Sequence, residues 1–343
     1  MPRRTRQDDH PHRVAIVQRP PVLLDRAATL KRAAEAVAEA AAAGAHLALF
    51  AEAYVPGYPE WIWRLRPADD GRLVGELHAR LLAEAVDLEA GGLGRLQQAA
   101  ARHHLTVAIG VQELDARYSR ATLFSTFVII GPDGTILRRH RKLMPTNPER
   151  MVWGLGDGAD LEPAETPAGR LGGLVCWENY MPLARYALYA GGVQLYLAPT
   201  WDAGETWLAT MRHIAAEGRC WVLGAGMALR GQDAAPDLPG RDQLYPDPDA
   251  WLNPGDSAVV APGGRIVAGP LHEGVGLLVA DCDPAAATAA HRTLDVAGHY
   301  ARPDVFQLTV DRHRRPLLEV DDAARAGERP LAGGSPPVGE PPR

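Results

Sequence analysis

The chain opens with a strand, a helix and a second strand, and this order restricts the possible folds more than any other feature. Residues 13–18 (RVAIVQ) and 46–50 (HLALF) are short apolar runs with the length of buried strands. Between them, residues 25–43 place alanine, leucine and valine at three- and four-residue steps, which predicts a helix that ends at Gly44. Such a unit is nearly always a right-handed crossover between parallel strands, so we expect an α/β fold.

The same alternation continues along most of the chain, and it predicts sheets whose outer faces are covered by helices. Turn signals at residues 131–134 (GPDG) and 262–264 (PGG) predict two hairpins. The stretches 143–163 and 231–256 are rich in glycine and proline, so we expect loops there. The other predicted strands cover residues 105–114, 122–130, 135–140, 171–175, 193–198, 220–226, 257–261, 265–268 and 275–281, and the other predicted helices cover 70–85, 93–104, 182–190, 205–218 and 284–290.

No shift in composition marks a linker, and we therefore expect one domain at residues 12–320. Residues 1–11 are polar, which predicts a flexible N-terminal segment. Residues 321–343 are rich in proline, glycine and charge without any periodicity, which predicts a disordered C-terminal tail.

The composition is that of an ordinary globular protein, and it argues against several classes of function. The 343 residues are 46% hydrophobic and 23% charged, and a net charge of −6 gives no reason to expect a nucleic acid or an anionic membrane as partner. No run approaches a membrane span and no apolar signal segment follows the charged N-terminus, so a cytoplasmic protein is expected. Three widely spaced cysteines and no glycine-rich phosphate loop predict no disulfide framework, no metal site and no cofactor.

Cys176 stands where a predicted strand gives way to a helix. Leu171, Leu174 and Val175 form the apolar run before it, and Pro182 lies at the start of the helix that follows. In open α/β sheets, functional sites gather outside the carboxyl ends of the strands. Backbone N–H groups at such a turn favour a thiolate, so Cys176 is a candidate nucleophile, with a small buried core residue as the alternative.

Two further chemically active residues also follow predicted strands. Glu52 comes directly after the strand at 46–50, and Lys142 lies in the basic run after the strand at 135–140. Each alone has a simpler interpretation, as a capping carboxylate or as part of a solvated basic surface. Together with Cys176 they supply a base, a cation and a nucleophile, and no serine-based motif competes with them.

These residues and their surroundings resemble the nitrilase superfamily of carbon–nitrogen hydrolases. The resemblance runs through RVAIVQ, FAEAYVPGYP, HRKLMPT, CWENYMPLARYALYAGG, LAPTWD and GHYARPDVF, and leaves out only residues 1–11 and 321–343. Within the superfamily, KLMPTNPERMVWGLGDG and CWENYMPL look like the true nitrilase branch. The resemblance implies a four-layer α-β-β-α sandwich, a catalytic triad of Glu52, Lys142 and Cys176, and hydrolysis of a nitrile to its acid and ammonia through a cysteine thioester.

Other residues are expected to support this triad. The resemblance places a second carboxylate at Glu149, which is a candidate to position the lysine or the hydrolytic water, with a plain ion pair in a loop as the alternative. The backbone N–H of Trp177 is a candidate anion donor, and His299 is a candidate orienting residue whose simpler interpretation is structural. Large aromatic side chains are candidates for an apolar substrate pocket, although they are also ordinary core residues: Tyr58, Trp153 and Trp201.

The resemblance also implies subunits that associate and continue the layering, as a homo-oligomer built from dimers or as a larger spiral. The predicted helices 182–190 and 205–218 are the expected symmetric interface.

Several functions stay open at this point. The same triad serves amidases and carbamoylases, which cleave a C–N single bond, and it serves an enzyme that releases the amide from a nitrile. An inactive member used as an assembly module is the non-enzymatic alternative, against which the intact triad argues. Aliphatic, arylacetonitrile, aromatic and amino-acid-derived nitriles are all compatible. The segments CWENYMPL and YLAPTWD resemble those of family members that act on aliphatic or amino-acid-like nitriles.

Overall fold

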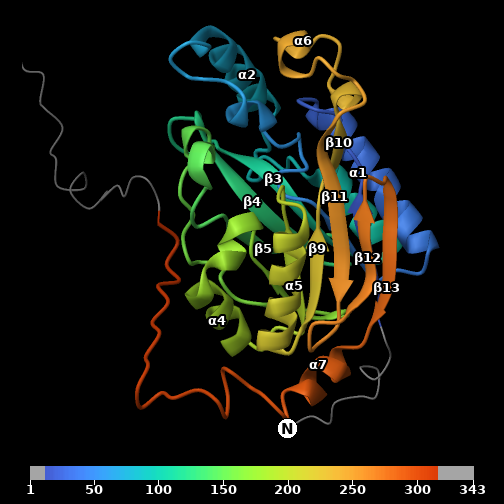
Figure 1. Cartoon of the computed structure of the whole chain (residues 1–343), viewed down its shortest axis with the longest axis vertical. Helices are drawn as coiled ribbons and strands as arrows, with labels where there is room; N and C mark the ends of the chain where they lie inside the picture. Colours follow the sequence, from blue (N-terminus) through green and yellow to red (C-terminus); the bar gives the residue numbers. More distant parts are fainter. Residues whose placement is uncertain (1–11, 316–343) are drawn as a thin grey trace, which may run out of the picture.

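Two β-sheets packed face to face form the centre of the protein (Figure 1). The computed structural model describes residues 12–315. The first sheet has the order β13-β1-β2-β3-β4-β5, in which β1, β2 and β3 are parallel and the remaining pairs are antiparallel. Its strands are β1 (His12–Gln18), β2 (Leu47–Phe50), β3 (Thr106–Asp115), β4 (Thr122–Ile130), β5 (Ile136–Arg141) and β13 (Gly276–Cys282).

The second sheet has the order β10-β11-β9-β8-β7-β6, and β12 pairs with β11 beside this path. Strands β7, β8 and β9 are parallel, and the remaining pairs are antiparallel. Its strands are β6 (Ala164–Thr166), β7 (Gly169–Gly173), β8 (Leu195–Pro199), β9 (Trp221–Ala225), β10 (Ala228–Arg230), β11 (Trp251–Val260) and β12 (Ile266–His272).

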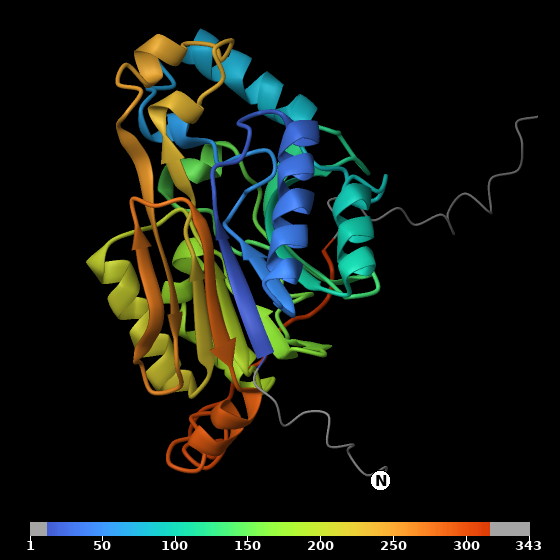
Figure 2. The ribbon, with the colours of Figure 1, turned by 90° about the vertical axis from the view of Figure 1, so that its right-hand side faces the viewer.

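Helices cover the outer face of each sheet. Figure 2 shows α1 on one side of the paired sheets and α5 on the other. α1 (Arg26–Ala42) and α3 (Gly94–His103) pack on the first sheet, and α4 (Pro182–Ala190) and α5 (Glu205–Gly218) pack on the second. The other helices are α2 (Gly71–Glu84), α6 (Arg241–Leu244), α7 (Pro284–Ala290) and the short 3₁₀ helices Glu60–Trp63, Asn147–Met151, Cys176–Tyr180 and Gly231–Asp233.

The alternation of side chains along β1 explains why four layers form. Val14 and Ile16 belong to the apolar layer between the two sheets, whereas Ala15 and Val17 belong to the layer beneath α1. Because successive side chains of a strand point to opposite faces, a strand that is apolar throughout must be covered on both sides. The expected four-layer α-β-β-α sandwich is confirmed.

Two predicted loops contain regular structure. The stretch 231–256 includes α6 and the beginning of β11, although it holds Pro254 and Gly255. The pairing of β11 with β12 shifts register directly after Gly255, where an irregular strand accommodates glycine. The stretch 143–163 contains a 3₁₀ helix at Asn147–Met151, begun by a capping interaction.

The two predicted flexible ends, 1–11 and 321–343, lie outside the described residues. Within residues 12–315, none of the helices has both the length and the apolar character needed to cross a membrane.

The core between the sheets makes a simple stability prediction. Leu197→Ala should lower the free energy of unfolding by about 2–5 kcal/mol, because Leu197 is fully buried between the two sheets. Val275→Ala, at a side chain that is 58% exposed, should change it by no more than about 0.5 kcal/mol. Denaturant unfolding at one protein concentration measures both values, and equal losses would contradict the two-sheet core.

Candidate active site

Three side chains from three strand ends meet in one buried cluster. Glu52 follows β2, Lys142 follows β5, and Cys176 lies just after β7. The Lys142 Nζ is 2.8 Å from Glu52 Oε1, and the Cys176 thiol hydrogen-bonds to the Glu52 carboxylate. All three are almost fully buried, with 4% of Cys176 exposed. The structure therefore brings the sulfur, the carboxylate and the ammonium into contact.

A second carboxylate, Glu149, lies on the other side of the ammonium. Its Oε2 is 2.6 Å from Lys142 Nζ and also accepts the backbone N–H of Thr146 at 2.6 Å. Its Oε1 accepts a hydrogen bond from the Tyr58 hydroxyl at 2.6 Å. Glu149 is thus held from three directions, and Lys142 is held between Glu52 and Glu149.

Cys176 occupies a sharp turn between strand and helix. Its φ of 51° lies in the left-handed region, which costs about 1–3 kcal/mol for a residue other than glycine. Asn179 stabilises the turn, because its side-chain N–H₂ donates to the carbonyl of Cys176 at 2.7 Å and to that of Leu174 at 3.0 Å. Tyr196 donates in turn to Asn179 Oδ1 at 2.8 Å. The turn is a constrained part of the core rather than a flexible loop.

The Glu52 carboxyl changes charge near neutral pH. Burial raises its pKa to about 7, against the opposing effect of Lys142 and with a further increase from Glu149. Ser125 donates its hydroxyl to Glu52 Oε1 at 3.3 Å, and the Trp201 N–H donates to Oε2 at 3.2 Å. A carboxyl with this pKa, in contact with a thiol, has the properties of a general base.

The expected thiolate at Cys176 is wrong for the free enzyme. Burial raises the pKa of the thiol well above its usual value and Glu52 raises it further, while Lys142 and a hydrogen bond with Thr200 lower it. Exclusion of water therefore outweighs the cation, and the thiol keeps its proton at neutral pH. A thiol in this state needs a neighbouring base before it can act as a nucleophile.

The ammonium of Lys142 is stable in this buried place. Burial alone would lower its pKa, but Glu52, Cys176 and Glu149 together raise it above its usual value. Lys142 therefore remains a fixed positive charge through the titration of Glu52.

The three predicted pocket residues pack together beside the cluster. Tyr58 and Trp201 stack with ring centroids 4.4 Å apart, and Trp153 meets Tyr58 edge-on at 5.7 Å. The Trp153 ring also lies 5.5 Å from Lys142 Nζ. Trp177, half exposed, donates its indole N–H to Asp202 at 2.9 Å. Tyr58, Trp153 and Trp201 therefore lie against the charged cluster, whereas the Trp177 ring faces Asp202.

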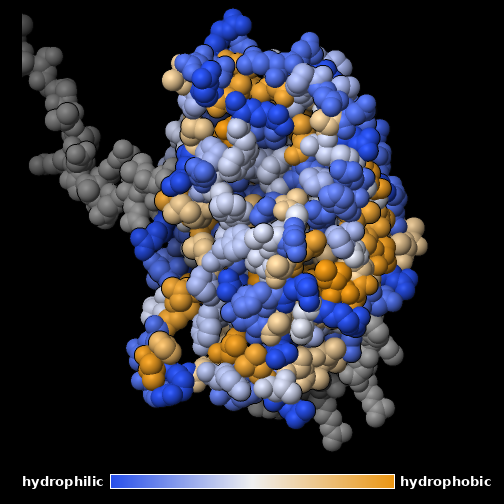
Figure 3. Space-filling view, in the orientation of Figure 1, coloured by the Kyte–Doolittle hydropathy of each residue, from blue (hydrophilic) through white to orange (hydrophobic). Residues whose placement is uncertain are grey.

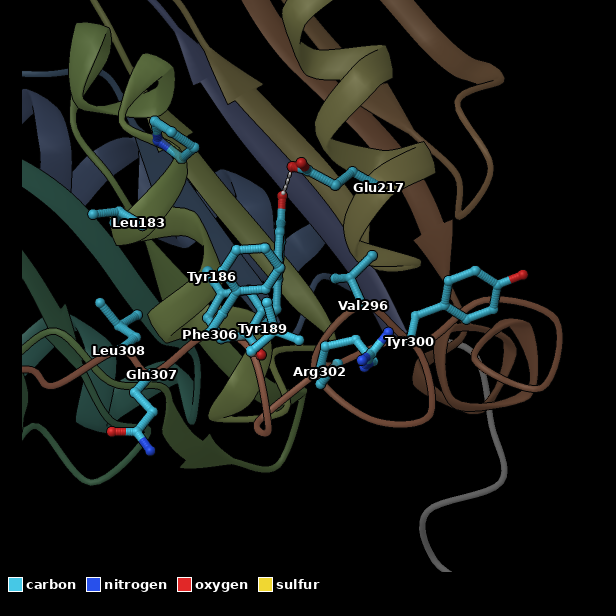
Figure 4. Close-up of a pocket in the computed structure, with 13 residues that line it drawn as sticks. Leu183, Tyr186, Tyr189, Glu217, Val296, Tyr300, Arg302, Phe306, Gln307 and Leu308 are labelled. Atoms are coloured by element: carbon cyan, nitrogen blue, oxygen red, sulfur yellow. Dashed lines mark hydrogen bonds between the residues drawn. The ribbon is translucent and has the colours of Figure 1, made fainter.

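The structure does not bring His299 to this cluster. His299 is exposed, and its ring packs against that of Tyr300 at a centroid distance of 5.3 Å. Tyr300 lines a cavity of about 580 Å³ between α4, the end of α5 and the C-terminal segment 291–315 (Figure 4). None of the predicted triad or aromatic pocket residues lines that cavity.

Sequence reasoning missed two hydroxyl groups in the site. Thr200 hydrogen-bonds to the Cys176 thiol, and Ser125 donates to Glu52. Thr200 follows β8, so its position at a strand end was a signal that could have found it. Ser125 lies within β4, and nothing in its sequence context distinguishes it. Among residues 12–315, no group of three or more histidine, cysteine, aspartate or glutamate side chains is arranged to hold a metal ion.

Comparison with known proteins agrees with the fold and identifies the family. Residues 13–292 match the family model described as carbon-nitrogen hydrolase. The chain is 43% identical over 313 residues to an aliphatic nitrilase of Sinorhizobium fredii, covering 89% of this chain and 97% of that protein. It is 38% identical over 312 residues to a bifunctional nitrilase/nitrile hydratase of Lupinus angustifolius, covering 88% of this chain and 86% of that protein.

A solved structure shows the same fold at lower sequence identity. Saccharomyces cerevisiae Nit3, described as a member of branch 10 of the nitrilase superfamily, superposes with a TM-score of 0.64 at 19% identity, covering 86% of this chain and 98% of that one.

The family model and the similar nitrilases show that the chain belongs to the carbon–nitrogen hydrolase family, and within it to the nitrilase branch. It is a hydrolase that acts on carbon–nitrogen bonds.

The electrostatics of the cluster predict how the thiol reacts. Alkylation of Cys176 by iodoacetamide should accelerate as the pH rises through about 7, because the Glu52 carboxylate that accepts the thiol proton forms over that range. Peptide mass spectrometry at a series of pH values measures the rate. Glu52→Gln should remove this inflection, and an inflection that persists in the variant would assign it to another group.

Proposed function

We propose that this enzyme hydrolyses an organic nitrile to the carboxylic acid and ammonia, with Cys176 as nucleophile, Glu52 as general base and Lys142 as the stabilising cation. The buried contact that joins the Cys176 thiol to Glu52, with Lys142 at 2.8 Å, carries the proposal. A nucleophile in contact with its base, and a base oriented by a third group, is the arrangement that nucleophilic catalysis requires.

The first half of the reaction forms a covalent intermediate. The Cys176 sulfur attacks the nitrile carbon while Glu52 accepts the thiol proton, and Glu52 then passes this proton to the nitrile nitrogen to give a thioimidate. A water molecule then adds to the thioimidate carbon, and Glu52 accepts a proton from it and passes that proton to the nitrogen. The tetrahedral intermediate collapses with loss of ammonia, which leaves an acyl thioester on Cys176.

The second half regenerates the thiol. A second water attacks the thioester carbon with Glu52 again as base, and the Cys176 sulfur leaves and recovers its proton. The acid is released, so one nitrile and two waters give one carboxylic acid and one ammonia. Glu149, which shares Lys142 with Glu52, keeps the ammonium directed at the reacting atoms.

Negative charge develops on the nitrile nitrogen and later on an oxygen, and two donors are available for it. Lys142 supplies its ammonium. The Trp177 N–H belongs to the start of a short helix, where backbone donors lack intrahelical acceptors. Each such donor contributes about 3–4 kcal/mol to transition-state stabilisation in comparable sites.

The covalent assignment is tested by deleting the sulfur. Cys176→Ala should abolish ammonia release from nitriles while the unfolding transition stays close to that of the unmodified enzyme, because only one buried atom is removed. Cys220→Ala is the matched control, since Cys220 is equally buried but lies in the core beneath α5. Retention of most activity by Cys176→Ala, or a stalled acyl group on Cys220 or Cys282 in mass spectra, would overturn the proposal.

The substrate class is proposed from the relatives and from the enclosed site. The Sinorhizobium relative is named an aliphatic nitrilase, and the stacked rings of Tyr58 and Trp201 leave an apolar boundary beside a nearly buried sulfur. We expect aliphatic nitriles to release ammonia faster than aromatic ones in a panel assayed at equal concentration. The same panel run with the matching amides separates a nitrilase from an amidase, which would release ammonia faster from the amide.

One observation favours the amide as a second product. The Lupinus relative is named as both a nitrilase and a nitrile hydratase. The tetrahedral intermediate can expel the Cys176 sulfur instead of ammonia, and this releases the amide. The acid-to-amide ratio for each nitrile, measured by chromatography, decides how the intermediate divides.

We also infer a cytoplasmic homo-oligomer that associates through α4 and α5. Apolar side chains are exposed there and on the adjoining C-terminal segment: Leu183 at 67% and Phe306 at 76% line the cavity shown in Figure 4. Figure 3 shows apolar patches among polar residues on the face that carries these helices. Exposed apolar patches of this kind mark association surfaces.

Leu183→Glu tests the association surface. A charge on this exposed position should lower the sedimentation mass of the assembly, because it would be buried without a partner at the interface. Val275→Glu, exposed on the turn between β12 and β13, is the control and should leave the mass unchanged. An unchanged mass in Leu183→Glu would place the interface elsewhere.

A further inference from the structure

The carboxylate of Glu178 joins the two backbone segments that carry Cys176 and Lys142. Glu178 has no exposed side-chain surface. Its Oε2 accepts the backbone N–H of Val175 at 2.7 Å, directly before Cys176. Its Oε1 accepts the backbone N–H of Leu143 at 2.6 Å, directly after Lys142. The Glu178 side chain thus links the turn after β7, which carries Cys176, to the end of β5, which carries Lys142.

His140 pairs with this carboxylate through its imidazole ring. His140 lies on β5, and its Nε2 is 3.1 and 3.2 Å from the two oxygens of Glu178. Burial alone would raise the pKa of Glu178, but His140 and the two backbone N–H groups lower it below its usual value. Glu178 therefore remains an anion, and both of its oxygens remain acceptors.

We propose that Glu178 is a positioning residue, whose two oxygens fix the distance between the Cys176 sulfur and the Lys142 ammonium. The inference deepens the proposed function and rests on it. Glu178 makes its hydrogen bonds to the neighbours of the triad residues, and the triad side chains bind one another. Only a carboxylate can accept both N–H groups at once, because an amide presents one oxygen and one N–H₂ group that would face a donor.

Loss of either hydrogen bond of Glu178 would also affect Glu52, the general base. The Lys142 ammonium lowers the pKa of Glu52, and loss of the Leu143 bond lets the lysine segment move away from it. The pKa of Glu52 then rises further above about 7. If the Val175 bond is lost instead, the sulfur moves away from the base. Either displacement slows proton transfer from the thiol.

Glu178→Gln tests the proposal. Turnover of a nitrile per folded enzyme should fall on the order of 100-fold, the usual result of misplacing reacting groups by about 1 Å, with little change in KM. The pH inflection for alkylation of Cys176 by iodoacetamide should move upward or the alkylation rate should fall at every pH. Glu178→Asp, which keeps the charge and both oxygens, should recover part of the lost turnover.

Asp25→Ala is the matched control. Asp25 also accepts a backbone N–H, that of Ala28 at 2.8 Å, but it lies at the start of α1. Its loss should lower the melting temperature without changing the turnover of folded enzyme or the alkylation profile, because no triad residue depends on it. A purely structural role for Glu178 would give this same pattern and would overturn the proposal.

The remaining outcomes are also decisive. Failure of both Glu178→Gln and Glu178→Asp to fold would assign Glu178 to stability and overturn its positioning role. The alkylation assay needs no nitrile, so it separates the two proposals. If the unmodified enzyme released no ammonia from nitriles but the alkylation profile still changed in Glu178→Gln, the proposed function would fail and the positioning role would stand.

Discussion

The buried ammonium of Lys142 is the interaction on which the site depends. It lies 2.8 Å from Glu52 and 2.6 Å from Glu149, and these side chains have almost no exposed surface. A charge in such a place is stable only when it is paired, and here one cation serves two carboxylates. Because one positive charge cannot fully balance both, burial and Glu149 leave Glu52 with a pKa of about 7, which suits a general base at neutral pH.

This cluster is precise because rigid elements carry it. Glu52 and Lys142 follow strands of the first sheet, whereas Cys176 follows a strand of the second, so the site exists only when the sheets are packed together. The backbone N–H of Lys142 donates to the backbone carbonyl of Ser125 at 2.8 Å, and the Asn179 side chain stabilises the turn at Cys176. Sites supported in this way by strands and neighbouring hydrogen bonds keep their reacting groups aligned.

Much of the fold and part of the site could be predicted because they follow from local patterns. The continuous apolar run within residues 13–18 and the helical spacing of residues 25–43 required covered sheets, and the structure confirms this. The beginning of β11 was missed because Pro254 and Gly255 are typical of turns, and only pairing with neighbouring strands makes that segment extended. Ser125 and Glu178 gave no local signal, since their roles depend on contacts between segments that are distant in the sequence.

The sequence by itself determined the residue types and their places at strand ends. The Cys176 thiol, the Glu52 carboxyl and the Lys142 ammonium each follow a segment that the sequence predicts to be a strand. The tertiary structure alone decided their ionisation. Cys176 at a helix start was expected to be a thiolate, but two packed sheets exclude water from it and keep its proton in place. Burial and the distances between charges are properties of the folded chain, and no local pattern in the sequence encodes them.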